Sequence, residues 1–170
     1  MPITLLSGPS GAGKTTVARI VAARGPAPSV HLHTDDFYAA IKQGVLAPYL
    51  PEAAPQNRVV TGVIARAAAG YAVGGYHVVV DGVIGPWFLG AYEEAAREAG
   101  VGLVYVVLRP VRETVLDRGA SRAAHPLTDR RVLGEIYEGF ADLGPYEARV
   151  LDSTGLTPEE TADAVLERRA

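Results

Sequence analysis

The sequence contains no cysteine, one methionine, one tryptophan and only two lysines, Lys14 and Lys42, in 170 residues. Without cysteine the chain has no disulfide, no thiolate metal site and no cysteine nucleophile. The other 14 of its 16 basic residues are arginines. Because lysine is so scarce, a lysine that stands inside a glycine-rich segment, as Lys14 does, is a specific feature rather than background.

A basic excess and long apolar runs are also absent. The formal net charge is −3, whereas proteins that coat nucleic acids or anionic membranes need an excess of positive charge. No apolar run approaches the roughly 18 residues that span a bilayer, and the first residues lack the basic segment of a signal peptide. We therefore expect a cytoplasmic protein that binds neither nucleic acid nor membrane. The sequence leaves a homodimer open.

Short apolar segments alternate with helical patterns along the whole chain. Apolar residues make up 48% of the sequence and charged residues 21%, which is typical of a globular domain, and we expect one domain over residues 1–170. Strands that are apolar throughout and separated by helices indicate an α/β fold, with a parallel sheet covered on both faces. The predicted strands are 3–7, 30–34, 78–81, 101–108 and 149–152; the predicted helices are 14–24, 36–43, 56–72, 87–99, 112–122, 128–143 and a last helix opened by Thr157-Pro158.

Residues 8–15 fit the phosphate-loop pattern G-x-x-x-x-G-K-[ST] without a mismatch, between a predicted strand and a predicted helix. Glycines let backbone N–H groups line an anion cavity, and the following helix directs its positive end at the phosphates. Lys14 can reach the β and γ oxygens of ATP, and the Thr15 hydroxyl can ligate Mg²⁺. The alternative is an ordinary glycine-rich turn. The predicted nucleotide-binding residues are Gly8, Pro9, Ser10, Gly11, Ala12, Gly13, Lys14, Thr15 and Thr16.

Three acids follow predicted strands, at the edge where open parallel sheets bind their ligands. Asp81 comes after three valines, and we assign it, with Thr15, to the coordination sphere of Mg²⁺. Asp35 is our candidate for the base that orients an acceptor hydroxyl, and Asp36 is a candidate acceptor-binding residue. Which of the two is the base stays open. The alternative for Asp35 is a helix N-cap that satisfies an N–H near Tyr38.

Two histidines precede these acids on the second predicted strand. His31 and His33 are two residues apart, so they share one face of that strand. Such a pair could ligate a metal, but we favour packed or polar positions in the sheet for both.

The segment 109–131, in the C-terminal half of the chain, is rich in arginine. Arg118 and Arg122 are four residues apart on a predicted helix and share a face. The transition state of phosphoryl transfer needs cationic donors, and breaks at Gly119 and His125-Pro126 would permit a hinged closure. We therefore predict a lid over about 112–131, in which Arg118 and Arg122 are catalytic. The alternative is a solvated helix face paired with neighbouring acids.

With these motifs the chain resembles the P-loop small-molecule kinases of the nucleoside-monophosphate-kinase-like group, nearest to chloramphenicol phosphotransferase and further from gluconate and shikimate kinases. The resemblance implies five parallel strands in the order 2-3-1-4-5, and transfer of the γ-phosphoryl group of ATP to a hydroxyl of a small molecule such as an antibiotic. The catalytic base of chloramphenicol phosphotransferase falls on Asp35. Shikimate kinases carry a further acid where this chain has His33. Nucleotide monophosphate kinases carry a Pro-Arg pair, whereas here Pro86 precedes Trp87, which favours an acceptor without a phosphate.

Residues 36–75 form the insertion in which this fold builds an acceptor pocket. Asn57, Arg58 and Trp87 are candidate pocket residues, with capping or packing as the alternative for each. The alternative functions are an ATP-dependent switch that acts on a partner protein, and a nucleoside or nucleotide kinase. A guanine-nucleotide switch is disfavoured because neither lysine lies in an N-K-x-D element.

Overall fold

The sheet has the predicted topology. In the computed structural model, which describes residues 1–121 and 127–168, five strands form one all-parallel sheet in the order β2-β3-β1-β4-β5. β1 lies at the centre and pairs with β3 on one side and β4 on the other. The strands are β1 (Ile3–Ser7), β2 (Ser29–His33), β3 (His77–Asp81), β4 (Leu103–Leu108) and β5 (Val150–Leu151).

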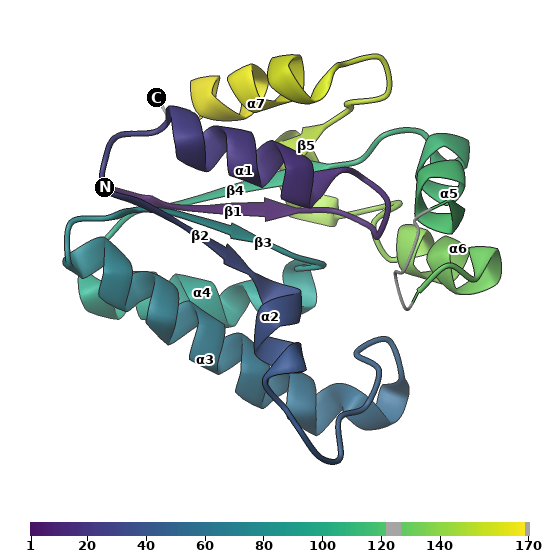
Figure 1. Cartoon of the computed structure of the whole chain (residues 1–170), viewed down its shortest axis with the longest axis horizontal. Coiled ribbons are helices and arrows are strands. Elements are labelled where there is room, and N and C mark those ends of the chain that lie inside the picture. Colours follow the sequence, from purple (N-terminus) through teal and green to yellow (C-terminus); the bar gives the residue numbers. More distant parts are fainter. Residues whose placement is uncertain (122–126, 169–170) are drawn as a thin grey trace.

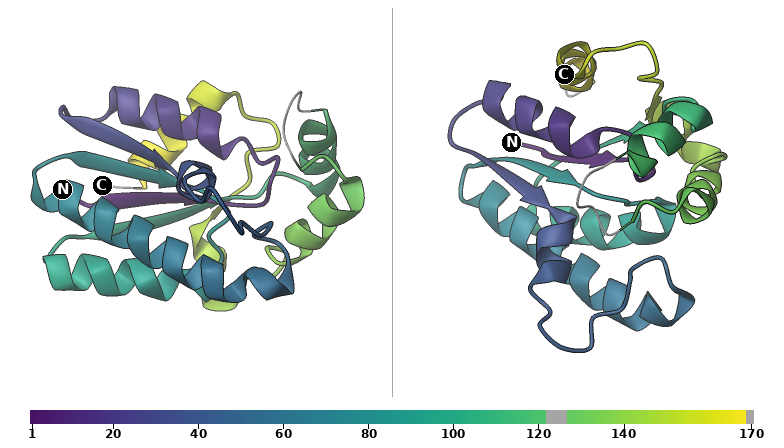
Figure 2. Two further views of the ribbon diagram at one scale, coloured as in Figure 1. Left: turned by 60° about the horizontal axis from the view of Figure 1, so that its bottom comes forward. Right: turned by 45° about the vertical axis from the view of Figure 1, so that its right-hand side comes forward.

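Helices cover both faces of the sheet and its carboxyl edge (Figure 1). α1 and α7 lie on one face, α3 and α4 lie on the other, and α5 and α6 stand beyond the carboxyl ends of the strands, as the turned views in Figure 2 also show. Among the described residues, no helix is both long and apolar enough to cross a bilayer. The helices are α1 (Lys14–Arg24), α2 (Thr34–Ala39), η1 (Pro51–Ala53), α3 (Ala54–Val73), α4 (Pro86–Ala99), α5 (Arg112–Ala120), α6 (Arg130–Glu138), η2 (Gly144–Arg149) and α7 (Pro158–Glu167).

The sheet separates two hydrophobic cores, because side chains of successive strand residues point to opposite faces. Leu5 and Val80 pack with α3 and α4 on one face. Leu6 and Val79 pack with α1 and α7 on the other. Every residue of β1 and β3 is buried, which explains why their sequences are apolar without alternation.

Two predicted boundaries were wrong in ways that affect the site. β2 ends at His33 and not at residue 34, and α2 begins at once with Thr34 and not at Asp36, so Asp35 lies with Asp36 in the first helical turn. Acidic side chains are favourable there because the first backbone N–H groups of a helix have no partners within it. The helix predicted over 128–143 is α6, which ends at Glu138; Phe140 then turns into the core, where it is fully buried.

The predicted start of the last helix is confirmed. Thr157 is the N-cap of α7, Pro158 is its first residue, and Thr157 and Glu160 exchange the two hydrogen bonds of a capping box. The short-range sequence pattern was sufficient here because all partners lie within three residues.

A buried hydrogen-bonded cluster holds the turn that follows β3. The Ile84 carbonyl accepts hydrogen bonds from the Ser7 hydroxyl at 2.7 Å and from the Tyr105 hydroxyl at 2.6 Å. The Ile84 N–H donates back to the Ser7 hydroxyl at 3.1 Å. This turn leads into α4, so the cluster links β1 and β4 to the carboxyl edge of β3.

Replacing Tyr105 with phenylalanine is expected to lower the free energy of unfolding by about 1 kcal/mol at pH 8, the usual net value of one hydrogen bond. Ile84 would keep its Ser7 donor, so no acceptor is left unpaired. Burial raises the pKa of Tyr105 to about 12. A pKa raised by folding contributes stability that is complete below about pH 10, the unfolded value, and is lost as the pH rises through about 12.

Urea unfolding of wild type and Tyr105→Phe between pH 8 and pH 12 measures both effects. The wild-type protein should lose more stability than the variant above pH 10, and their curves should converge. A constant difference across that range would contradict this role of Tyr105.

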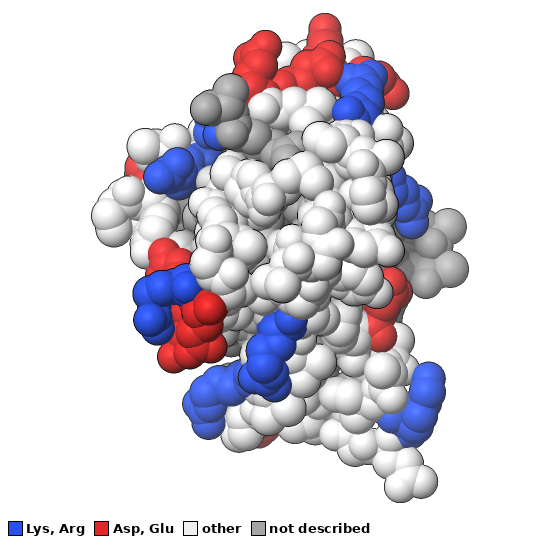
Figure 3. Space-filling view, turned by 90° about the vertical axis from the view of Figure 1, so that its left-hand side faces the viewer, with Lys and Arg blue, Asp and Glu red and all other residues white. Residues whose placement is uncertain are grey.

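The surface at the amino ends of the strands carries few charges at its centre (Figure 3). Met1, Tyr71, Val73 and Tyr76 are exposed apolar side chains near this end of the sheet. The glycine loop that follows β1 lies at the opposite end (Figure 1). This surface is therefore separate from the predicted phosphate loop.

Candidate functional site

The predicted phosphate loop joins β1 to α1 and has the backbone that an anion cradle needs. Gly8, Gly11 and Gly13 all have positive φ angles, and Gly13 is the N-cap of α1 without any side-chain capping bond. Gly13 itself offers no side-chain oxygen to the N–H groups that open α1, which suits a site for an anion. The Lys14 ammonium is largely buried and donates to the Pro9 carbonyl at 2.9 Å, across the loop.

The loop lies directly against α5. A Cβ atom on Gly11 would be 2.4 Å from the Val115 carbonyl oxygen and 3.2 Å from the Gly119 nitrogen. Only glycine permits this approach, and the contact brings the C-terminal half of α5 next to the phosphate cradle. The helix that carries Arg118 is thus adjacent to the loop, although about a hundred residues separate them in sequence.

Asp81 is the centre of a buried polar network at the end of β3. Its carboxylate is fully buried, and its Oδ2 atom accepts a hydrogen bond from the Thr15 hydroxyl at 2.7 Å. Its Oδ1 atom contacts His31 Nε2 at 2.6 Å and His33 Nδ1 at 3.0 Å. The structure thus brings together the two residues assigned to Mg²⁺ from the sequence, and it adds both histidines to them.

The charges in this network stabilise one another. Burial acts to raise the pKa of Asp81, but hydrogen bonds from His31, His33 and Thr15 outweigh it and hold that pKa well below the ordinary value. The pKa of His33 is raised to about 10, first by its contact with Asp35 and then by its hydrogen bond to Asp81. At neutral pH a protonated His33 therefore lies between two carboxylates.

Sequence analysis missed the role of the histidines. We favoured packed or polar sheet positions for His31 and His33, and polar positions agree with the structure. We did not predict that their common partner is Asp81. The parallel register places His33 opposite Asp81, and the alternation of side chains puts His31 on the same face. The i, i+2 spacing together with an acid ending a later strand was the available signal. Each of the two rings has a nitrogen in contact with Asp81, which argues against our alternative that the pair ligates a metal.

Asp35 and Asp36 lie in the first turn of α2, and both are exposed. Asp35 Oδ2 is 3.5 Å from His33 Nε2. The N-cap of α2 is His33 and not Asp35, so the alternative capping role of Asp35 does not hold. Asp35 therefore lies at the carboxyl edge of the sheet. The His33 ring lies between it and Asp81, which is hydrogen-bonded to Thr15.

Asn57 was a candidate pocket residue with capping or packing as the alternative, and its contacts agree with packing. Its side chain is buried, it accepts a hydrogen bond from the Tyr38 hydroxyl at 3.1 Å, and it donates to the Pro48 carbonyl at 2.8 Å. The Asn57 amide therefore connects α2, the following loop and α3, because a buried amide needs both kinds of partner. Arg58, the next residue, is exposed.

Trp87 is the second residue of α4 and is 55% exposed. Its ring packs edge-on against Phe140, with the ring centroids 5.5 Å apart, and covers Gly85 so closely that a Cβ atom there would be 2.2 Å from it. Half of the indole is thus fixed by packing while the other half faces solvent. This arrangement suits a platform for a flat or apolar ligand.

The predicted lid is only partly covered by the structure. Arg122 and His125-Pro126 lie outside the described residues. Gly119 lies inside α5, where a Cβ atom would be 2.7 Å from Leu133 Cδ1. It is therefore a packing contact between α5 and α6, and our interpretation of Gly119 as a hinge was wrong.

Most arginines of this segment are paired with acids. Within the described part of residues 109–131, Arg118 is the arginine that has no acidic partner, and it is exposed. Arg118 is therefore the candidate that can contact a ligand without breaking an ion pair. The pairs are Arg109–Glu147, Arg112–Glu138, Arg130–Glu113, Arg130–Asp117 and Arg131–Glu135.

Arg118→Ala is expected to lower kcat for ATP turnover by roughly tenfold or more while raising the KM for ATP less, because its contacts with charge should strengthen in the transition state. Arg131→Ala, which removes an exposed arginine paired with Glu135 on α6, is the control. Steady-state kinetics of both variants test the lid. An unchanged kcat in Arg118→Ala would contradict the lid and favour the alternative, in which this part of α5 is a solvated helix face.

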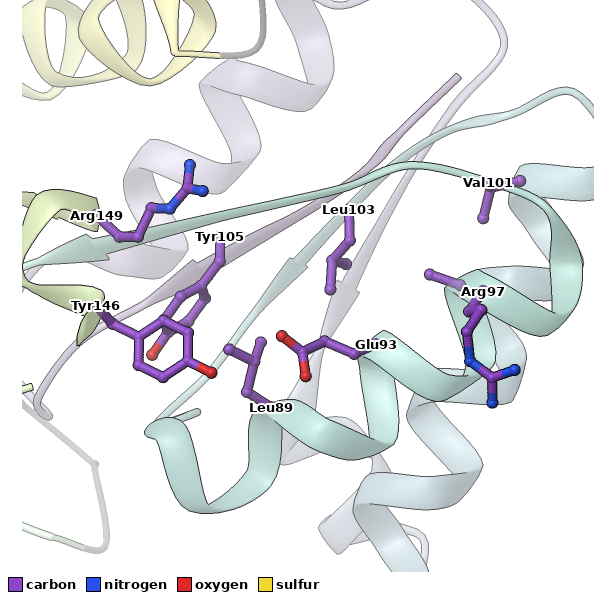
Figure 4. A pocket seen from close by; sticks show the side chains of 9 residues that line it. Leu89, Glu93, Arg97, Val101, Leu103, Tyr105, Tyr146 and Arg149 are labelled. Atoms are coloured by element: carbon purple, nitrogen blue, oxygen red, sulfur yellow. The ribbon is translucent and has the colours of Figure 1, made fainter. Parts of the chain in front are cut away.

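One cavity lies away from these residues. It has a volume of about 270 Å³ and lies between α4, β4 and η2 (Figure 4). Its lining includes Val101 and Leu103, at the amino end of β4, and the charged side chains of Glu93, Arg97 and Arg149. None of the predicted site residues lines this cavity. The candidate site therefore consists of the phosphate loop and the carboxyl ends of the strands, and not of this cavity.

The residues present suit a Mg²⁺–nucleotide. Thr15 and Asp81 offer hard oxygen atoms, which Mg²⁺ prefers, and Lys14 offers an ammonium beside the phosphate cradle. In the described chain, no group of three or more histidine, aspartate or glutamate side chains is arranged to hold a metal ion by itself. Mg²⁺ at such a site would take further ligands from nucleotide phosphates and water, as is usual for this ion.

A parallel sheet in the order 2-3-1-4-5, with a glycine loop and lysine between β1 and α1, defines a P-loop nucleotide-binding fold of the kinase type. Residues 3–142 match the model of the family described as AAA domain, and the chain belongs to that family. A search of curated protein sequences finds no significant match.

Solved structures with the same fold match almost the whole chain at low identity. A sugar kinase from Janibacter sp. HTCC2649 has a TM-score of 0.73 and 20% identity over 99% of this chain and 94% of that one. A gluconokinase from Sinorhizobium meliloti 1021 has a TM-score of 0.69 and 19% identity over 99% and 93%. The tunicamycin resistance protein of Deinococcus radiodurans has a TM-score of 0.69 and 18% identity over 99% and 95%. At these identities the likeness establishes the fold.

Proposed function

We propose that the protein is an ATP-dependent kinase that transfers the γ-phosphoryl group to a hydroxyl of a small molecule. The observation that carries the proposal is the meeting, at one sheet edge, of the phosphate loop, the Thr15–Asp81 pair and the exposed acid Asp35. Fold relatives that are described as a sugar kinase and a gluconokinase support the same class of reaction.

In the proposed reaction the acceptor oxygen forms a bond to the γ-phosphorus of ATP. The bond from that phosphorus to the oxygen bridging the β and γ phosphates breaks, and its electron pair leaves with ADP. The proton of the acceptor hydroxyl passes to the Asp35 carboxylate. Lys14 and Arg118 supply positive charge to the phosphoryl oxygens, and Thr15 and Asp81 hold Mg²⁺. When bound, Mg²⁺ neutralises charge on the phosphates.

We further propose that the acceptor carries no negative charge and has an apolar part. Asp35 and Asp36 would repel an anion at the sheet edge, and the described lid arginines other than Arg118 are paired with acids. The loop of the insertion that precedes η1 exposes four large apolar side chains, and a group of exposed apolar side chains is typical of a surface that binds an apolar ligand. They are Val45, Leu46, Tyr49 and Leu50, and Trp87 is a further half-exposed aromatic residue.

Antibiotics with a free hydroxyl are one class of acceptor that fits this description. The resemblance to chloramphenicol phosphotransferase supports it, and one fold relative is itself described as a tunicamycin resistance protein. Hydroxylated metabolites with a planar or apolar part fit equally well.

An ATP-consumption screen tests the proposal, with mass spectrometry to detect phosphate added to the acceptor. The compounds should include pairs that differ only in a carboxylate or phosphate, together with hydroxylated antibiotics. We expect turnover with neutral members and little with their anionic counterparts. Turnover that responds to a partner protein, and to no small hydroxyl compound, would instead favour the nucleotide-dependent switch.

A further inference from the structure

His33 is the residue that connects the two acids of the candidate site. Its Nδ1 atom is 3.0 Å from Asp81 Oδ1, and its Nε2 atom is 3.5 Å from Asp35 Oδ2. A carboxylate oxygen only accepts hydrogen bonds, so the ring presents N–H to Asp81 on one side and faces Asp35 on the other. The imidazole thus spans a fully buried carboxylate and an exposed one.

The two carboxylates differ in how well they are held. Asp81 is buried within β3 and contacts Thr15, His31 and His33. Asp35 has a side chain that is 64% exposed and stands on α2, a helix of six residues. An exposed side chain on a short helix samples several rotamers unless a neighbour restrains it, and a general base must keep its place within a fraction of an ångström.

We propose that His33 is a positioning residue, whose ring holds the Asp35 carboxylate at a defined place relative to Asp81 and the phosphate loop. This inference rests on the proposed function, because it takes Asp35 as the base. His33 touches neither nucleotide nor acceptor in this role; it acts through Asp35. The predicted base, Asp35, is thereby connected through the His33 ring to Asp81, the carboxylate assigned to Mg²⁺.

His31 provides the matched comparison. It contacts the same Asp81 oxygen as His33, but it lies two residues earlier on β2 and so about 7 Å further from the strand end. Loss of His31 and loss of His33 should affect Asp81 similarly, whereas the effect on Asp35 should differ. Asparagine suits position 33, because its amide N–H can replace Nδ1, which contacts Asp81, and it lacks the far nitrogen that faces Asp35. Glutamine suits position 31, because its longer side chain places an amide N–H near the position of Nε2, the atom that contacts Asp81 there.

The first test is kinetic, on the full chain with the best acceptor from the screen. His33→Asn should lower kcat for transfer by roughly tenfold or more, with the KM for ATP changed less than about threefold, because misplacement of a base mainly affects the chemical step. His31→Gln should lower kcat clearly less. In an Asp35→Asn background, His33→Asn should cause no further loss, because its target is gone. Equal losses in the two histidine variants, or fully additive losses in the double variant, would overturn the inference.

The second test does not depend on activity. Crystal structures of wild type, His31→Gln and His33→Asn should show the Asp35 carboxylate displaced by about 1 Å or more only in His33→Asn, a shift large enough to matter for catalysis. An Asp35 carboxylate that stays in place in His33→Asn would overturn the positioning role. If no hydroxyl compound is phosphorylated by wild type, but Asp35 moves only in His33→Asn, the proposed function fails and the positioning role stands.

Discussion

Lys14→Ala is expected to lower ATP turnover by roughly 10²- to 10³-fold, the usual cost of removing one charge-stabilising donor from a transition state. The ammonium lies across the phosphate loop, where it donates to the Pro9 carbonyl. Its place serves phosphate charge rather than the hydrophobic core, so the fold should survive the change. Turnover assays and thermal unfolding of the same preparation measure the two effects separately.

Arg19→Ala is the control for Lys14→Ala, since Arg19 is an exposed cation on the same helix, α1. It should keep both activity and melting temperature. A Lys14→Ala variant that is unfolded, or that retains turnover within about threefold of wild type, would argue against a phosphate-binding role for the loop.

Asp35→Asn should reduce transfer to the acceptor by roughly 10²- to 10⁴-fold, the range for loss of a general base, while ATP affinity is preserved. Asp81→Asn should instead raise the Mg²⁺ concentration needed for activity, because Asp81 pairs with Thr15, the other metal-side residue. Nucleotide titrations and Mg²⁺ dependence of kcat distinguish the two variants. If Asp35→Asn mainly weakens binding of Mg²⁺–ATP, the two roles must be exchanged.

Asp36→Asn is the comparison that settles which acid is the base. Asp36 is the next residue in the first turn of α2 and is also exposed. A larger loss of transfer in Asp36→Asn than in Asp35→Asn would assign the base to Asp36. The proposed role of His33, which is to position Asp35 as the base, would then fail.

One expectation that came from the family resemblance and one that depended on local sequence agree with the structure. The strand order 2-3-1-4-5 was implied by the family resemblance and is observed. The start of α7 at Thr157-Pro158 is confirmed. Boundaries were less accurate where chain partners far apart in sequence decided them, as at the end of α6, where burial of Phe140 stops the helix before position 143.

The sequence by itself determined the fold class, the phosphate loop and the strand-end acids, because apolar periodicity, glycine spacing and strand ends are local properties. Only the tertiary structure decided which side chains meet. The register of β2 on β3 brings His33 to Asp81, α5 comes against Gly11, and folding pairs the lid arginines with acids and leaves Arg118 unpaired within the described residues. These contacts join residues far apart in the chain, and no local pattern encodes the register that places one strand or helix beside another.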